Sequence, residues 1–335
     1  MTRLLRTLPT VVAAALLAAS LVPCAAQDWA KQILTKSPRH GEYITIKEPS
    51  GRALQAFVVY PEVKDKAPVV VLIHEIFGQS DWAKEMADEL AGAGYIVVEP
   101  DLLSGFGPPM TGLPNDAMKP KTAGANSAIK GQAFPGVPKC DPMPCPASTP
   151  EDHAHMNMGT PTTGAAYMAM SPGGTAAFPN QDAVVKAVSS LDANVVTGDL
   201  DAAADYGKKL PSANGKLYVA GFCWGGGKTF LFATHRKDLS AAFVFYGPPP
   251  PADAMQNITA PVYGFYAGND ARISATIPQT QTDMKAAGKT YEPVTYDGAG
   301  HGFMRAGEAP DANAANSAAR AAGFRRLVDL LGGVR

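Results

Sequence analysis

YVAGFCWGGG, residues Tyr218–Gly227, is the stretch that decides the fold. A short apolar run leads into a cysteine that has Gly221 two residues before it and Gly225 two residues after it. A helix-compatible stretch then begins at Trp224, which completes the G-x-S-x-G nucleophile-elbow pattern with cysteine in place of serine. A sharp turn from strand to helix crowds both flanking positions, so glycine is required there. The pattern predicts that Cys223 is a nucleophile at a helix N-terminus, where the helix dipole favours the thiolate.

This stretch has two other interpretations. The cysteine could be a buried structural residue in a glycine-rich turn, and the letters alone leave that alternative open. A phosphate-binding loop is excluded, because Gly227-Lys228-Thr229 would need a glycine five residues before Gly227, where the chain has Phe222.

Length and charge limit the classes of protein that the chain can belong to. It has 335 residues, a formal net charge of -1 and 46% hydrophobic residues, enough for one large core. A nearly neutral chain has no electrostatic attraction for nucleic acid or for an acidic membrane. We therefore expect no nucleic-acid partner and a small-molecule substrate, and we expect the protein to be a monomer.

The first 26 residues have the pattern of an export signal. Arg3 and Arg6 precede an apolar stretch, Val11–Val22, and small residues follow at 24–26. This predicts a signal peptide over 1–26 and a mature domain over 27–335 that is secreted or periplasmic, without stable membrane association. The sequence Leu21-Val22-Pro23-Cys24 also resembles a lipidation box, although Pro23 is unusual there, so a lipoprotein is one alternative. An uncleaved anchor is another, although the apolar run is short for a membrane span.

The remaining cysteines fit an exported protein. Cys140 and Cys145 lie close together in a proline-rich segment, and an oxidising compartment would allow them to form a disulfide. With Cys24 in the signal, Cys223 would then be the free thiol that a cysteine nucleophile requires.

Strands and helices alternate along the chain, apart from one long interruption. This alternation predicts a single α/β domain, a mostly parallel twisted sheet with helices on both faces. Residues 104–179 have no sustained periodicity and form a loop-like insertion, interpreted as a lid, a metal-binding loop or a disordered loop. The predicted strands are Tyr43–Ile46, Leu54–Tyr60, Pro68–Ile73, Tyr95–Val98, Lys216–Phe222, Ala241–Tyr246, Val262–Tyr266 and Tyr291–Tyr296, and the predicted helices are Asp81–Ala91, Gln181–Leu191, Asp199–Leu210, Trp224–Thr234, Thr276–Ala287 and Ala314–Leu331.

Three further residues follow predicted strands at their carboxyl ends, where reactive groups collect in an open α/β sheet. They are Glu75, Asp270 and His301. The chain order of nucleophile, acid and histidine is that of α/β-hydrolases. His301 would accept the thiol proton and Asp270 would orient the imidazole. Taken singly, an aspartate or a histidine in a glycine-rich loop is more often a turn former.

Other backbone and side-chain groups are expected near these residues. The backbone N–H groups of Ile76 and Trp224 would face the developing oxyanion. His74 is expected to be a hydrogen-bonded structural histidine, and Tyr246 ends a strand near the predicted site.

Taken together, these residues resemble the dienelactone hydrolase family, α/β-hydrolases with a Cys-Asp-His triad. The similarity extends from Tyr43 to Leu331, apart from the insertion, and rests on Glu75-Ile76-Phe77-Gly78, Gly221-Phe222-Cys223-Trp224-Gly225-Gly226, Asp270 and His301-Gly302-Phe303. The resemblance implies hydrolysis of a small ester or lactone, without a metal or another cofactor.

The resemblance also implies roles for two charged residues. Glu75 would pair with the Cys223 thiol in the resting enzyme and take part in activating it, and Arg305 would bind a substrate carboxylate. A second substrate arginine is expected shortly after Asp101, where the chain has Gly105 or a neighbour instead. Because two arginines bind a dicarboxylate-like lactone better than one, an ester or lactone of another shape fits better than dienelactone itself.

A rival function comes from the insertion. Residues Glu151–Met158 include two histidines and two methionines, side chains that suit copper. This suggests an exported copper-binding protein on a catalytically idle hydrolase scaffold. The same residues are also typical of a methionine-rich lid or of a low-complexity loop.

Overall fold

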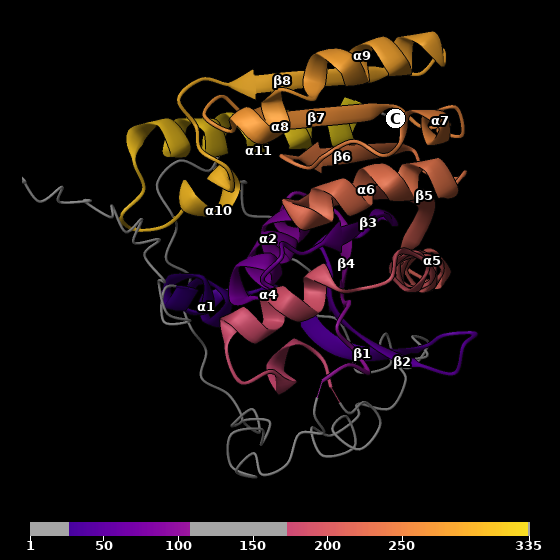
Figure 1. Cartoon of the computed structure of the whole chain (residues 1–335). Coiled ribbons are helices and arrows are strands. Elements are labelled where there is room, and N and C mark those ends of the chain that lie inside the picture. Colours follow the sequence, from indigo (N-terminus) through magenta and orange to yellow (C-terminus); the bar gives the residue numbers. More distant parts are fainter. Residues whose placement is uncertain (1–26, 108–172, 334–335) are drawn as a thin grey trace, which may run out of the picture.

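The computed structural model describes residues 27–107 and 173–333. Within them the chain forms one eight-stranded sheet, ordered β1-β2-β4-β3-β5-β6-β7-β8 (Figure 1). The first three neighbouring strands pair antiparallel, and all the later neighbours pair parallel. The strands are β1 (Gly41–Lys47), β2 (Ala53–Val59), β3 (Ala67–Ile73), β4 (Ile96–Asp101), β5 (Ala213–Phe222), β6 (Ala241–Phe245), β7 (Val262–Ala267) and β8 (Tyr291–Tyr296).

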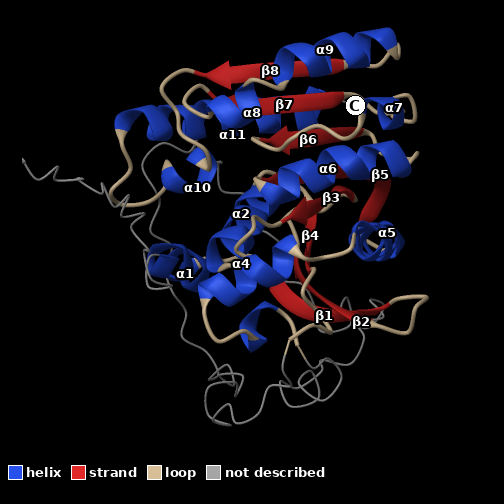
Figure 2. Ribbon diagram, viewed as in Figure 1, coloured by secondary structure: helices blue, strands red, loops and turns tan. Residues whose placement is uncertain are grey.

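Helices cover both faces of this sheet (Figure 2). They are α1 (Asp28–Lys36), α2 (Asp81–Gly92), α4 (Gln181–Ser189), α5 (Ala193–Lys209), α6 (Trp224–His235), α7 (Ala252–Met255), α8 (Ala271–Ser274), α9 (Ile277–Ala286), α10 (Phe303–Ala306) and α11 (Ala314–Gly333). The structure confirms the predicted α/β-hydrolase architecture.

The apolar run of β3 explains why the sheet needs two helical layers. Its side chains alternate between two cores because successive residues of a strand point to opposite faces. Val69 and Val71 join the core that includes residues of α5 and α6, whereas Val70 and Leu72 join the core that includes residues of α2 and α11. In Figure 1, α6 lies in front of the sheet and α11 lies behind it. Burial on both faces fixes the strand that leads into the loop of residues 74–78.

Helix boundaries differ from the prediction at α5. The prediction began this helix at Asp199, but the structure begins it at Ala193. The Asp192 carboxylate accepts hydrogen bonds from the backbone N–H groups of Asn194 and Val195, so it caps the helix six residues earlier. The β-branched residues that follow this cap have modest helix propensity, but burial of Val196 compensates for it. Helix α1 was not predicted either.

The two ends of the predicted insertion lie side by side. Ser104 and Gly173 form an isolated antiparallel bridge, and the Asp101 carboxylate accepts hydrogen bonds from the backbone N–H and the hydroxyl of Thr175. A short 3₁₀ helix, η2 (Thr175–Ala177), follows. Cys140, Cys145 and the copper-ligand candidates at 151–158 lie outside the described residues, as does the signal segment 1–26.

Among the described helices, none combines the length and apolar composition that crossing a bilayer requires.

Candidate active site

Cys223 occupies the tight turn between β5 and α6. Its φ is 56°, a left-handed conformation that few non-glycine residues adopt. A Cβ atom on Gly221 would lie 2.4 Å from the carbonyl oxygen of Gly225, and one on Gly225 would lie 2.3 Å from the carbonyl oxygen of His74. The turn therefore requires glycine at both positions, for the steric reason given from the sequence.

The structure brings Cys223, His301 and Asp270 together in a row. The sulfur lies 3.1 Å from Nε2 of His301, in the loop after β8. On the other side of the ring, Nδ1 lies 2.5 Å from Oδ2 of Asp270, which follows β7 and caps α8. Because a carboxylate only accepts hydrogen bonds, Nδ1 carries the proton and Nε2 is free to receive one from the thiol. This is the geometry of a nucleophile with its oriented base.

Glu75 and Arg305 form an ion pair beside this row. Nε of Arg305 donates to Oε2 of Glu75 at 2.7 Å, and only 3% of Glu75 is exposed. The guanidinium also lies over the Phe77 ring, 4.9 Å from its centroid. These contacts differ from the expected resting pair of Glu75 and the Cys223 thiol. The buried carboxylate is hydrogen-bonded to the Arg305 guanidinium instead, and the thiol is hydrogen-bonded to His301.

The expectation of a stabilised thiolate is wrong for this arrangement. Burial, and after it the nearby charge of Glu75, raise the pKa of the Cys223 thiol to about 11. Hydrogen bonds from the backbone N–H groups of Trp224 and Ile76, and the charge of Arg272, act in the opposite direction but are smaller. The sulfur is consequently a thiol at neutral pH. The two predicted oxyanion donors do both point toward the sulfur.

Comparison with known proteins places this chain in a family. The family model described as "Dienelactone hydrolase family" matches residues 54–334. The chain belongs to the dienelactone hydrolase family.

Several relatives within that family are curated proteins. The carboxymethylenebutenolidase of Pseudomonas putida is 24% identical over 265 residues, 79% of this chain and 86% of that protein. A protein named "Putative carboxymethylenebutenolidase" from Salmonella typhi is 26% identical over 272 residues, 78% of this chain and 77% of its own length. One with the same name from Methylorubrum extorquens is 38% identical over 135 residues, and there the match spans 37% of this chain and 46% of that protein.

Solved structures show the same fold. A "Putative Dienelactone Hydrolase" from Klebsiella pneumoniae superposes with a TM-score of 0.59 at 22% identity, covering 87% of this chain and 97% of the other. A promiscuous phosphotriesterase from metagenomic libraries, described as dienelactone hydrolase-like, gives a TM-score of 0.57 at 17% identity and covers 88% and 98% of the two chains. Together with the family match, this makes the chain a dienelactone-hydrolase-like hydrolase.

Two neighbours of this dienelactone hydrolase-type site were not assigned a role from the sequence. Tyr246 is fully buried with a φ of 40°, and its ring packs edge-on against His301 at 5.0 Å. Arg272, in α8, is exposed and lowers the pKa of Cys223. Its position two residues after Asp270 was the available signal, since a cation next to the predicted acid would also lie near the nucleophile.

One carboxylate cluster outside the dienelactone hydrolase-type site has the spacing of metal ligands. Oxygen atoms of Glu85, Glu89 and Glu308 lie within 4.8 Å of one another. However, the Arg320 guanidinium already donates to Glu89 and to Glu308. A cation of the protein itself therefore occupies this cluster.

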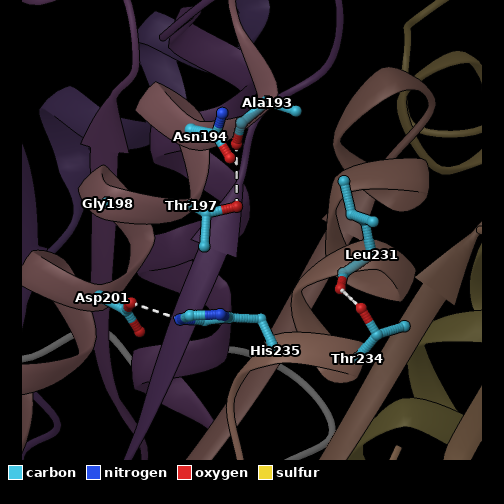
Figure 3. Close-up of a pocket in the computed structure, with 8 residues that line it drawn as sticks. All are labelled: Ala193, Asn194, Thr197, Gly198, Asp201, Leu231, Thr234 and His235. Atoms are coloured by element: carbon cyan, nitrogen blue, oxygen red, sulfur yellow. Dashed lines mark hydrogen bonds and ion pairs between the residues drawn. The ribbon is translucent and has the colours of Figure 1, made fainter. Parts of the chain in front are cut away.

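A surface groove of about 430 Å³ lies between α5 and α6 (Figure 3). Across it, Nε2 of His235 lies 2.7 Å from Oδ2 of Asp201. The groove is at the C-terminal half of α6, whereas Cys223 precedes the first residue of that helix. At 1.5 Å of rise per residue, the two are roughly 15 Å apart along the helix axis, so the groove is separate from the triad. Its lining residues are Ala193, Asn194, Thr197, Gly198, Asp201, Leu231, Thr234 and His235.

Proposed function

We propose that this protein is an exported hydrolase that cleaves small esters or lactones through a thioester on Cys223. The observation that carries the proposal is the row in which the sulfur lies 3.1 Å from His301 and His301 lies 2.5 Å from Asp270. Relatives named carboxymethylenebutenolidase support an ester or lactone as the substrate class. Export is supported by the charged and apolar pattern of residues 1–26.

Acylation begins with proton transfer from the thiol to Nε2 of His301. The sulfur then attacks the substrate carbonyl carbon, a C–S bond forms, and the carbonyl electrons move onto the oxygen. The N–H groups of Ile76 and Trp224 donate to this oxyanion, an interaction typically worth about 3–4 kcal/mol per donor. Asp270 stabilises the imidazolium without taking its proton.

The tetrahedral intermediate collapses by breaking the bond to the leaving oxygen. His301 returns its proton to that oxygen, which leaves as an alcohol, or stays tethered when the substrate is a lactone. Water then attacks the thioester with His301 as the general base, and the acid product departs as the thiol is restored. Apart from the thiol proton, for which Glu75 is a second acceptor once it is released from Arg305, every proton in this sequence passes through Nε2 of His301.

Because the pKa of Cys223 is raised, the thiol must lose its proton before the sulfur can attack the substrate. Glu75 contributes to that raised pKa while it is bonded to Arg305. A substrate anion that binds the Arg305 guanidinium would compete with Glu75 and release the carboxylate, which could then accept the thiol proton. Substrate binding and nucleophile activation would thereby be coupled.

Replacement of Arg305 by lysine tests its contact with a substrate anion. Lysine keeps a cation beside Glu75 but loses the planar fork of donors. We expect KM for an ester carrying a free carboxylate to rise about tenfold, whereas KM for a neutral ester of the same size changes less than threefold. Equal KM changes for the two esters would show that Arg305 does not recognise the anion.

The central test is the Cys223→Ala variant, assayed on small activated esters. We expect its kcat to fall roughly a thousandfold or more, because the nucleophile acts as a unit with its base. Mass spectrometry of the wild type after rapid acid quenching should find the acyl group on the peptide that contains Cys223. Full activity in a Cys223→Ala preparation with an unchanged melting temperature would refute the proposal.

The copper-binding alternative is not favoured. The family match and the relatives named carboxymethylenebutenolidase both point to a hydrolase.

A further inference from the structure

His74 is buried directly behind the predicted oxyanion donors. It follows β3, and none of it is exposed to solvent. Its Nδ1 lies 2.7 Å from the carbonyl oxygen of Glu75. A carbonyl only accepts hydrogen bonds, so Nδ1 must carry the proton and donate it. Burial lowers the pKa of this histidine below its ordinary value, so the ring is the neutral Nδ1–H tautomer.

The hydrogen bond of His74 acts on the peptide unit that supplies one oxyanion donor. The carbonyl of Glu75 and the N–H of Ile76 belong to the same peptide group, which is planar. The Ile76 N–H points toward the Cys223 sulfur. Holding the oxygen end of the plane therefore fixes the direction of the N–H end. It also polarises the amide, which strengthens the N–H as a donor.

His74 also contacts the residue that supplies the other oxyanion donor. Its ring stacks on the Trp224 indole, with centroids 5.7 Å apart and planes inclined by 10°. The backbone makes a second contact, because a Cβ on Gly225 would meet the carbonyl oxygen of His74 at 2.3 Å. The end of β3 and the start of α6 are thus in direct contact at this histidine.

We propose that His74 is a positioning residue that aligns the Ile76 and Trp224 N–H groups for the oxyanion. The inference rests on the proposed function, since it concerns the tetrahedral intermediate of ester cleavage. The described contacts of the His74 ring are with the Glu75 carbonyl and the Trp224 indole, so its effect must pass through the Glu75–Ile76 peptide and the Trp224 ring. The second ring nitrogen, Nε2, has no hydrogen-bond partner among the described residues, which leaves Nδ1 as the atom with a polar role.

Three variants distinguish the effect of the Nδ1 hydrogen bond from the effect of the side chain's volume. His74→Asn places an amide nitrogen where Nδ1 lies. His74→Leu fills similar volume without a donor, and His74→Gln carries its amide nitrogen one bond further out. We expect kcat to fall about tenfold to a hundredfold in the Leu variant, with KM changed less than threefold. The reason is that a misaligned N–H donor weakens a hydrogen bond that forms mainly in the transition state, when the oxyanion develops. The Asn variant should keep kcat within about threefold of the wild type.

A second measurement distinguishes alignment from a general loss of structure. A trifluoromethyl ketone forms a tetrahedral adduct with a thiol and places an oxyanion in the hole, whereas a product carboxylic acid does not. The inhibition constant of the ketone should weaken in parallel with kcat in the Leu variant, while that of the acid stays constant. If the Leu variant does not fold, the Asn and Gln variants give the same comparison, with Gln expected to behave as a donor-less side chain.

Each outcome bears on the proposal. Wild-type kcat in a folded Leu variant, or equal losses in the Asn and Leu variants, would overturn the role of the Nδ1 donor. Failure of the proposed function would be visible elsewhere, as absence of ester turnover by the wild type or full turnover by Cys223→Ala, and the positioning role would fall with it.

Discussion

At the scale of single residues, the Cys223 sulfur lies among groups with opposite effects. Burial and the Glu75 carboxylate disfavour the thiolate, whereas two backbone N–H groups and Arg272 favour it. The first pair dominates, so the resting residue is a protonated thiol hydrogen-bonded to His301. Because thiolates are the form that oxidants attack, a protonated thiol is less easily oxidised.

Glu75→Gln is predicted to separate thiol reactivity from ester turnover. Because the pKa of Cys223 is about 11 and only the thiolate reacts, alkylation of the wild type by iodoacetamide should rise about tenfold per pH unit from 7 to 9. Removing the Glu75 charge lowers that pKa and leaves Arg305 unpaired, which lowers it further. Alkylation at pH 7.5 should then be about threefold faster for each unit by which the pKa falls, since a less basic thiolate is also less nucleophilic.

Ester turnover should move the other way in this variant. If Glu75 helps to activate the thiol when substrate is bound, kcat of Glu75→Gln falls while alkylation accelerates. Alkylation of the wild type that levels off near pH 6–7 would contradict the raised pKa. Glu62→Gln, an exposed substitution, is the matched control for both measurements.

At the scale of elements, helix α2 is hydrogen-bonded to the chain just after the His301–Arg305 segment. Trp82, in its first turn, donates from Nε1 to Glu308, and Arg320 of α11 bridges Glu308 and Glu89. Glu308 follows α10, three residues after Arg305. Helices α2, α10 and α11 therefore hold the His301–Arg305 segment from behind the sheet.

Glu85 makes this cluster sensitive to pH. Burial, with repulsion from Glu308 and Glu89, raises the pKa of its carboxyl to about 9. The unfolded chain loses this proton near pH 4.3, so between about pH 4.3 and 9 the folded state binds more protons than the unfolded state. The contribution of Glu85 to stability is therefore complete at low pH and is lost as pH rises through this window.

Glu85→Gln should remove that pH dependence. The amide stays neutral, so the variant is expected to be more stable than the wild type at pH 8 by a few kcal/mol, because each pH unit above about 4.3 costs the wild type about 1.4 kcal/mol. Each kcal/mol corresponds to roughly 2–4 °C in melting temperature. At pH 4 the difference should vanish. Thermal unfolding across pH 4–9 measures it, with Glu62→Gln as the exposed control. A difference that is independent of pH would show that Glu85 is not protonated in the folded state.

At the scale of the whole molecule, the sheet collects groups that are distant in sequence. Glu75 follows β3, Cys223 follows β5, Asp270 follows β7 and His301 follows β8, and parallel pairing brings these strand ends to one edge. The ends of the insertion also meet, at the Ser104–Gly173 bridge.

Much of this arrangement was predictable from sequence because its causes are local. Alternating apolar runs gave the strand positions, and the glycines around Cys223 revealed the elbow because steric crowding in a tight turn concerns adjacent residues. Chain order then placed Asp270 and His301 after the correct strands. The start of α5 was missed because the Asp192 cap outweighed the modest propensity of the residues after it.

The sequence by itself therefore determined the hydrolase fold and the candidate nucleophile, acid and base. Tertiary structure decided their electrostatic state. The Glu75–Arg305 bond joins residues 230 positions apart, and the raised pKa of Cys223 depends on how completely other elements exclude water from it. The hydrogen bond from His74 to the Glu75 carbonyl joins neighbouring residues, but the Ile76 N–H faces the sulfur only because β3 and β5 pair in this register. Desolvation and long-range pairing arise only when the whole chain has packed, and no local pattern records them.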